Sequence, residues 1–237
     1  MKFDVVTLFP GLFAGGLQES IQGRARRAGR VSVRLHDLRR WGVGRHNQVD
    51  DNPYGGGGGM ILRPEPFFEA VDWVRERHPA KRERVVLLSP QGQRLTHDRA
   101  KQLASYERVI LLCGRYEGVD ERVREGLADE ELSIGDMVLT GGELPAMVVI
   151  DAVSRFIPGV LGRKEAADED SFAQGQLDSP YYTRPPVHRG RAVPEVLLSG
   201  DHRAISQWRE EQAREATRIK RPDLLAGEGR HGGARAR

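Results

Sequence analysis

A run of five consecutive glycines, residues 55–59, lies between Tyr54 and Met60. Glycine has no side chain and adopts positive φ angles readily, so such a run suits a backbone that must approach a ligand closely. It is not a phosphate-binding P-loop, because no Gly-Lys-Ser/Thr follows, and it is not a dinucleotide fingerprint, because the pattern stops at Met60. On composition alone, a loop that binds nothing remains the alternative.

Three further loops carry glycines beside polar residues, at positions where a parallel sheet would present the carboxyl ends of its strands. They comprise residues 88–92, 112–118 and 133–143. In open α/β sheets, ligands bind in the crevice outside those ends, where backbone amides and carbonyls can recognise a base and a ribose. The sequence therefore predicts a small-molecule site in an α/β domain.

The elements that would position these loops alternate between strand and helix. Apolar and β-branched runs predict strands at residues 3–9, 31–35, 84–88 and 108–113. Helical spacing of apolar residues predicts helices at residues 12–21, 66–77, 96–106 (with Thr96 as N-cap), 119–127 and 143–156. Residues 39–59 have no apolar period and are predicted to form a long functional loop. This order favours a parallel α/β sheet.

The composition changes near Pro158. Residues 164–170 are acidic and poor in apolar side chains, as is typical of a linker. One clear helix is predicted at 201–219 and a turn at 222–225, and the last ten residues, rich in Gly and Arg, are expected to be disordered. We therefore predict a larger domain over residues 1–160, an interdomain linker over 161–178 and a small, mostly helical domain over 179–237.

The chain has 237 residues, a formal net charge of +3 and 38% hydrophobic residues, which is typical of a soluble globular protein. No apolar run approaches the ~18 residues of a membrane span, and an N-terminus with an acid at Asp4 and a break at Pro10 is no signal peptide. The single cysteine, Cys113, rules out an intramolecular disulfide framework and a cysteine-based zinc site. We expect a cytoplasmic protein without a membrane anchor.

Charge is distributed unevenly along the chain. Residues 18–48 carry eight Arg against two acids, residues 107–131 carry eight acids against four Arg, and residues 176–237 carry twelve bases against eight acids. Two basic zones on either side of an acidic one predict a protein that binds a polyanion with part of its surface. A genome rich in G and C would explain the preference for Arg over Lys, but not this clustering.

Several long strings closely resemble the bacterial tRNA (guanine-N1)-methyltransferase family, TrmD. They are residues 114–122 (Gly-Arg-Tyr-Glu-Gly-Val-Asp-Glu-Arg), 133–146, 155–162, 169–172 (Glu-Asp-Ser-Phe) and 182–185 (Tyr-Thr-Arg-Pro). The match runs in unbroken order from Phe3 to about Leu225. The resemblance implies a parallel α/β domain of the SPOUT class with a deep C-terminal trefoil knot, followed by a small helical tRNA-binding domain. Periodicity alone reveals no knot.

The activity that the resemblance implies is methyl transfer from S-adenosylmethionine to N1 of the guanosine immediately 3′ of the tRNA anticodon, supporting reading-frame maintenance. The implied partners are the tRNA anticodon stem-loop and a second copy of the chain, with each active site shared between the two subunits. A magnesium requirement is also implied, although the sequence shows no carboxylate cluster with ligand spacing. Another knotted RNA methyltransferase with a different target base, or a non-catalytic RNA-binding relative, are the alternatives.

The same motifs imply the residues of the site. Those implied to bind the cofactor are Pro90, Gly114, Glu117, Ser133, Ile134, Gly135, Asp136, Met137, Val138, Leu139, Gly141 and Gly142. Glu117 would face the positively charged methionine amine. Asp170 is implied as general base and Arg155 as its partner at the guanine. Composition alone would assign Asp170 to a solvated linker and Arg155 to a structural role.

Weaker candidates for contact with RNA rest on residue type, because His, Arg and aromatic side chains on loops can stack a base and hold its phosphates. They are His46, Asp50, Tyr54, Arg184 and His188. A solvated surface explains any one of them equally well.

The residue types at the implied catalytic positions suit the chemistry. Guanine N1 carries a proton that a carboxylate can accept, and negative charge developing on O6 calls for a cation such as arginine. The sequence departs from the usual family pattern at three places. Gly58 replaces a proline, which predicts a looser loop, and Leu87 and Met137 stand where many relatives carry an aromatic residue.

Overall fold

The computed structural model describes residues 1–162 and 166–225, and the chain divides into two compact units, Met1–Lys164 and Glu165–Arg237. The tail that was expected to be disordered lies outside the described residues. Within the described ranges, no helix is long and apolar enough to cross a membrane.

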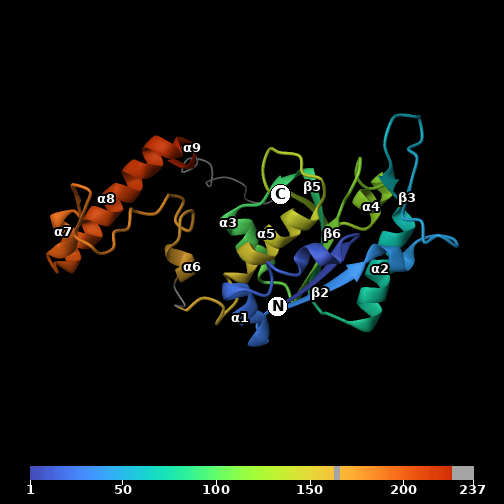
Figure 1. Ribbon diagram of the computed structural model, residues 1–237, viewed down its shortest axis with the longest axis horizontal. Helices are drawn as coiled ribbons and strands as arrows, with labels where there is room; N and C mark the ends of the chain where they lie inside the picture. The colour runs from blue at the N-terminus through green and yellow to red at the C-terminus, as the bar shows by residue number, and fades with distance from the viewer. Residues whose placement is uncertain (163–165, 226–237) are drawn as a thin grey trace, which may run out of the picture. The chain divides into compact units, whose positions relative to one another are not determined.

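The first unit is built on a sheet of five parallel strands in the order β2-β1-β6-β5-β7, which confirms the predicted parallel α/β sheet (Figure 1). The strands are β1 (Lys2–Thr7), β2 (Ser32–Asp37), β5 (Glu83–Arg94), β6 (Arg108–Cys113) and β7 (Glu130–Ser133). Every residue of the central strand β6 is buried. Its apolar run therefore faces two cores rather than one, as in parallel sheets covered on both sides.

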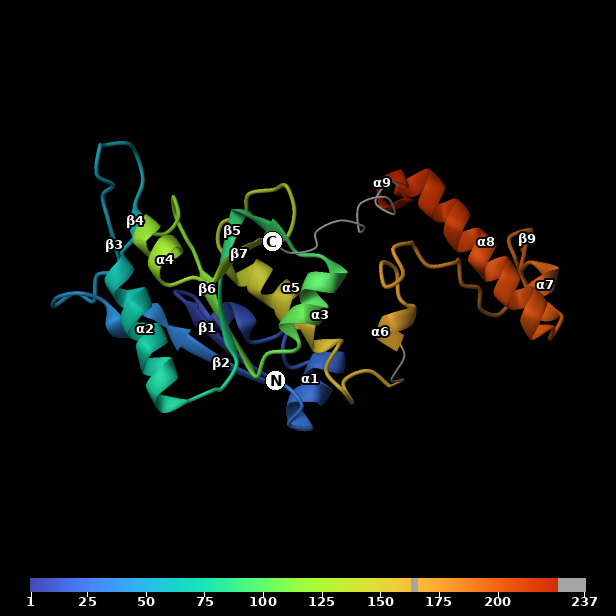
Figure 2. The same cartoon turned by 180° about the vertical axis from the view of Figure 1, so that it is seen from behind.

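Helices cover both faces of this sheet (Figures 1 and 2). One core lies under α1 (Ser20–Arg27), α3 (His97–Leu103) and α5 (Glu143–Ser154). The other lies under α2 (Pro64–Arg77) and α4 (Glu121–Gly126). Thr96 accepts a hydrogen bond from the amide of Arg99, so the predicted N-cap of α3 is confirmed.

Two short elements and a hairpin complete the first unit. They are the 3₁₀ helices η1 (Pro10–Phe13) and η2 (Leu38–Trp41) and the antiparallel strands β3 (Asp50–Asp51) and β4 (Ile61–Leu62). The glycine run connects β3 to β4. The segment 39–59, predicted to be a loop throughout, thus contains part of η2 and all of β3.

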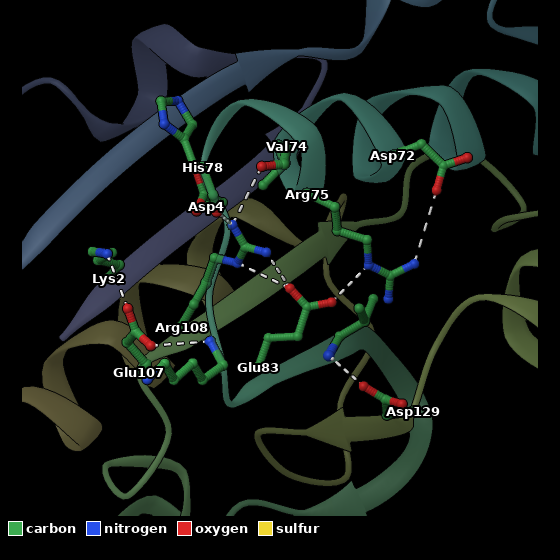
Figure 3. Close-up of polar contacts among 12 residues, drawn as sticks. Lys2, Asp4, Asp72, Val74, Arg75, His78, Glu83, Glu107, Arg108 and Asp129 are labelled. Atoms are coloured by element: carbon green, nitrogen blue, oxygen red, sulfur yellow. Dashed lines mark hydrogen bonds and ion pairs between the residues drawn. The ribbon is translucent and has the colours of Figure 1, made fainter.

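A buried arginine forms hydrogen bonds at the amino-terminal edge of the sheet (Figure 3). Arg108, which is 1% exposed, pairs with Glu83 and donates to the carbonyl oxygens of Val74 and His78 at the end of α2. Arg75 donates to the second carboxylate oxygen of Glu83 at 2.6 Å. Burial favours the neutral acid, but the hydrogen bonds from Arg108 and Arg75 outweigh it, so the pKa of Glu83 is lowered.

The sequence prediction was wrong in two further parts of the first unit. The apolar residues of segment 12–21 do not form one helix, because η1 ends at Phe13 and α1 begins only at Ser20, with Gly15 and Gly16 between them. Strand β7 was missed because Leu132 is its only apolar residue; its glutamates are instead held by ion pairs, such as that between Glu130 and Arg84 at 3.3 Å.

The second unit is mostly helical, with one short hairpin. Its elements are α6 (Ala166–Glu169), β8 (Val187–His188), β9 (Arg191–Ala192), α7 (Glu195–Leu198), α8 (His202–Lys220) and α9 (Pro222–Leu225). The side chain of Asp201 caps α8 by accepting from the amides of Arg203 and Ala204. The segment 161–178, which was predicted as a linker, includes α6. In the same segment, the amide of Leu177 donates to the buried hydroxyl of Thr217 on α8 at 2.9 Å.

Candidate active site

A cavity of about 250 Å³ opens beside residues 87–91 of β5, where the pairing of β5 with β6 ends, and at the ends of β6 and β7. All three segments that the sequence singled out contribute to its wall, at one edge of the parallel sheet. Residues 88–92 were wrongly predicted as a loop, because they continue strand β5. The lining includes ten of the predicted cofactor-binding residues, namely Pro90, Gly114, Glu117, Ser133, Ile134, Met137, Val138, Leu139, Gly141 and Gly142. The structure therefore gathers most of these candidates around one space, and their role as ligands stays a prediction.

The two other candidates, Gly135 and Asp136, lie outside the wall of the cavity. Gly135 forms a tight turn with Ser133, whose hydroxyl accepts from the Gly135 amide at 3.1 Å and donates to its carbonyl oxygen at 2.9 Å. The φ of +142° at Gly135 explains why glycine occupies this position. Asp136 forms an exposed ion pair with Arg94 at 2.9 Å. Both residues shape the loop rather than line the cavity.

The start of α5 lies directly against the end of β6. The amide of Gly142 donates to the carbonyl oxygen of Gly114 at 3.0 Å. A Cβ atom on Gly142 would lie 2.7 Å from the Cα atom of Cys113, which leaves room only for glycine. Cys113 itself is fully buried, and this burial, together with the nearby Glu143 carboxylate, raises the pKa of its thiol. Cys113 therefore packs as a small buried apolar residue.

Glu117 borders the cavity beside the end of the glycine run. A Cβ atom on Gly59, whose φ is +89°, would lie 2.6 Å from both Cγ and Oε1 of Glu117. The exposed carboxylate of Glu117 therefore occupies space that a side chain at position 59 would need. Leu87, Met137 and Leu139 supply apolar surface to the same cavity.

Sequence reasoning did not single out Arg115, Tyr116 and Thr140, which also line the cavity. All three lie within the predicted loops, so their position was available, but nothing in the local pattern distinguished them. Arg115 pairs with Glu143, whose side chain is 1% exposed.

The two predicted catalytic residues lie in different units. Arg155 is the half-buried C-cap residue of α5 in the first unit. Asp170 directly follows α6 in the second unit, and its carbonyl oxygen accepts from the amide of Ala173 at 3.1 Å. The pairing of the Asp170 carboxylate with Arg155 at a guanine base stays a prediction.

The candidates for RNA contact are distributed over both units. Asp50 lies in β3, and Tyr54 stands fully exposed in the connection from β3 to β4. His46 is exposed in the turn between Val43 and Gln48. Arg184 and His188 are exposed in the second unit, with His188 in β8. Within residues 1–162 and 166–225, no three His, Cys, Asp or Glu side chains gather closely enough to hold a metal ion.

This geometry defines a class of protein: an α/β protein whose candidate small-molecule site lies at the carboxyl edge of a parallel sheet. Comparison with known sequences then gives the family. The sequence model described as tRNA (Guanine-1)-methyltransferase TrmD matches residues 1–227, and the chain belongs to this family.

Similar curated proteins cover nearly the whole chain. A tRNA (guanine-N(1)-)-methyltransferase of Geobacter sulfurreducens is 56% identical over 225 residues, which are 95% of this chain and 91% of that protein. Proteins of the same name from Dehalococcoides mccartyi and Geobacillus kaustophilus are 54% and 50% identical, each over 95% of this chain and over 90% and 91% of their own length.

Proposed function

We propose that this protein transfers the methyl group of S-adenosylmethionine to N1 of the guanosine immediately 3′ of the tRNA anticodon, in support of reading-frame maintenance. The observation that carries the proposal is the cavity beside β5 and at the ends of β6 and β7, because the strings that resemble the family supply its wall. As a tRNA-modifying enzyme, the protein would act in the cytoplasm.

The residues around the cavity fit S-adenosylmethionine. The three glycine-bearing segments line the cavity, and neither Gly141 nor Gly142 has room for a side chain, because a Cβ atom would meet Arg115 or Cys113. Leu87, Met137 and Leu139 offer apolar contact for an adenine ring. Glu117 would hold the ammonium group of the methionine portion. When bound, the donor supplies a methyl group already activated by a sulfonium, so the protein has mainly to position the acceptor.

The catalytic roles of Asp170 and Arg155 follow from the resemblance and the acceptor chemistry. The bound donor would supply the methyl group to guanine N1 and would leave as a neutral thioether. The N1 proton passes to the Asp170 carboxylate, and the Arg155 guanidinium stabilises the negative charge on O6. Asp50 and Tyr54 on the β3–β4 hairpin, with His46 nearby in sequence, would contact the RNA from the first unit, and Arg184 and His188 from the second.

Magnesium, which the resemblance also implies, does not fit the described residues in the same way. No group of three potential ligands is present in them. We therefore assign the ion no step.

We also propose the trefoil knot and the homodimer. The support for the knot is membership of the family, whose resemblance implies it; the packing of Gly142 against the Cys113 backbone brings two segments together but does not by itself require threading. For the dimer, the support is apolar surface: Leu144 and Val148, one turn apart on α5, are 52% and 44% exposed, and Leu12 on the neighbouring η1 is 49% exposed. Exposed apolar patches of this kind are typical of interfaces.

The decisive test is methyl transfer to tRNA transcripts that differ only at the guanosine after the anticodon. We expect transfer to the guanosine transcript and none to a control with adenosine at that position, with product mapped to N1 by mass spectrometry. Equal transfer to both transcripts would favour a knotted methyltransferase with another target base. Binding of tRNA without any transfer would favour a non-catalytic RNA-binding protein. Repeating the reaction with a chelator tests the need for magnesium.

A further inference from the structure

A buried carboxylate lies at the first turn of α5, just outside the cavity described above. Glu143 is 1% exposed, and its Oε1 atom accepts a hydrogen bond from the Thr7 hydroxyl at 2.8 Å. Its Oε2 atom accepts a hydrogen bond from Nε of Arg115 at 3.0 Å and forms an ion pair with Nη2 of the same guanidinium, also at 3.0 Å. A buried charge is tolerated when it is paired and its remaining lone pairs are used, and Glu143 meets both conditions.

The Arg115 side chain connects the loops that form one wall of the cavity. Its Nη1 atom donates to the carbonyl oxygen of Thr140 at 3.1 Å, and its guanidinium lies over the ring of Phe9 at 4.4 Å. The backbones of Gly141 and Arg115 form an isolated antiparallel β-bridge. A Cβ atom on Gly141 would lie 2.2 Å from Arg115 Nε. The arginine thus fastens the loop after β6 to the loop before α5.

Thr7 is the remote end of this arrangement. It is the last residue of β1, fully buried and outside the wall of the cavity. Its hydroxyl donates to Glu143 and accepts from the amide of Phe9 at 2.9 Å, so it fixes the carboxylate and the ring that Arg115 contacts. Without this hydroxyl, the buried Oε1 atom of Glu143 loses a hydrogen bond, and a buried polar atom without a hydrogen-bond partner is energetically costly.

We propose that Thr7 and Glu143 are positioning residues for the methyl-donor site, and that they act through Arg115. The proposal rests on the proposed function, because it assumes that the cavity receives the donor. The Thr7 hydroxyl holds the Glu143 carboxylate in place. The carboxylate in turn holds the planar guanidinium of Arg115, whose N–H groups form a fork. The fork fixes the spacing between the Arg115 and Thr140 backbones, which are parts of the cavity wall.

The test compares Thr7→Val, which keeps the shape and removes the hydroxyl, with Thr7→Ser, which keeps the hydroxyl. Thr217→Val is a matched control, because it also removes a fully buried threonine hydroxyl that both donates and accepts, but in the second unit. The dissociation constant of S-adenosylhomocysteine, the demethylated donor, is measured for each full-length protein by titration calorimetry. Urea unfolding is measured in parallel, so that binding is compared at temperatures where every variant is folded.

We expect Thr7→Val to weaken binding of S-adenosylhomocysteine about tenfold, the scale of one hydrogen bond to a buried charge. Thr7→Ser and Thr217→Val should stay within about twofold of the wild type, and the KM for tRNA should not change in Thr7→Val. Arg115→Lys supplies a second variant in case Thr7→Val does not fold: it keeps the charge but not the fork, and should weaken binding to a similar extent.

Three results would overturn the proposal. They are wild-type affinity in Thr7→Val or in Arg115→Lys, a loss in Thr7→Ser as large as that in Thr7→Val, and an equal loss in Thr217→Val. Each would show that the contacts from Thr7 through Glu143 to Arg115 do not specifically position the donor site. Failure of the wild type itself to bind S-adenosylhomocysteine would instead overturn the proposed function, and this outcome is known before any variant is measured.

Discussion

The backbone amide of Glu117 donates a hydrogen bond to the carbonyl oxygen of Met60, with 3.1 Å between nitrogen and oxygen. Two further backbone hydrogen bonds, from the Leu62 amide to Gly118 and from the Asp120 amide to Leu62, extend this contact. They fasten the hairpin that carries the glycine run to the loop that follows β6. The side chain of Glu117, on the wall of the cavity, is therefore packed against the last glycine of the run.

A side chain at position 59 should therefore weaken donor binding. In Gly59→Ala, the new Cβ atom would lie 2.6 Å from Glu117 Oε1, so the carboxylate has to move away from its position at the cavity. We expect the dissociation constant of S-adenosylhomocysteine to rise about fivefold to tenfold, the scale of one hydrogen bond to a charged group. Calorimetric titration measures this change.

Gly55→Ala is the matched control for that variant. Gly55 has a φ of +86°, close to the +89° of Gly59, so alanine is strained equally at both positions, but nothing lies within 4 Å of a Cβ atom there. We expect its donor affinity to equal that of the wild type. A similar loss in both variants would show that loop strain, and not the displacement of Glu117, weakens binding.

The replacement of the family's usual proline by Gly58 should reduce stability rather than alter the fold. Unlike the other four glycines of the run, Gly58 does not have a positive φ, and a Cβ atom there would meet open space. We expect Gly58→Pro to raise the free energy of unfolding by about 0.4–1 kcal/mol, because proline restricts the unfolded chain. Urea unfolding curves of the two proteins measure the difference. Gly57→Pro should be destabilising instead, because its φ of +118° is closed to proline.

The sequence predicted the core of the fold because its central elements have strong local patterns. The strand predicted at 108–113 is β6, with the same bounds, and every residue in it is buried. Strand β5, in contrast, continues to Arg94 through a register shift between Leu88 and Gln93, where Pro90 and Gly92 are typical of a loop. Its pairing with β7, a contact between distant residues, decides the structure there, and no local pattern encodes such a contact.

The candidate site was predictable to a similar degree. Glycine-bearing loops at one edge of a sheet follow from the order of elements, so the residues that line the cavity through their backbones were found. Thr7 and Glu143 were not found as members of the site, because their roles depend on hydrogen bonds between residues 136 positions apart. A threonine at the end of a buried strand and a glutamate at the start of a helix are ordinary in isolation.

The assignment of Asp170 as general base predicts a specific loss. Asp170→Asn keeps the shape of the side chain but cannot accept the N1 proton, so single-turnover methyl transfer should fall at least ~100-fold. Binding of S-adenosylhomocysteine and of tRNA should stay close to the wild type, as equilibrium titrations can establish. Transfer at a nearly normal single-turnover rate would remove Asp170 from the mechanism.

The last prediction concerns the chain that supplies Asp170. The cavity belongs to the first unit and Asp170 to the second. The resemblance implies that, in the proposed dimer, the second unit of one chain would serve the cavity of its partner. Two inactive variants test this arrangement. Gly141→Trp places a large side chain where even a Cβ atom would lie 2.2 Å from Arg115 Nε, and Asp170→Ala removes the base.

Each variant should be inactive as a homodimer. After random subunit exchange about half of the dimers are mixed, and a mixed dimer with shared sites contains one site with an intact cavity and an intact base. One of the two sites is then intact in half of the dimers, which is one quarter of all sites. About one quarter of the wild-type activity should therefore return. If each chain supplied its own base, every site in a mixed dimer would lack one component. Activity that stays at zero, with exchange verified by native mass spectrometry, would therefore place cavity and base in the same chain.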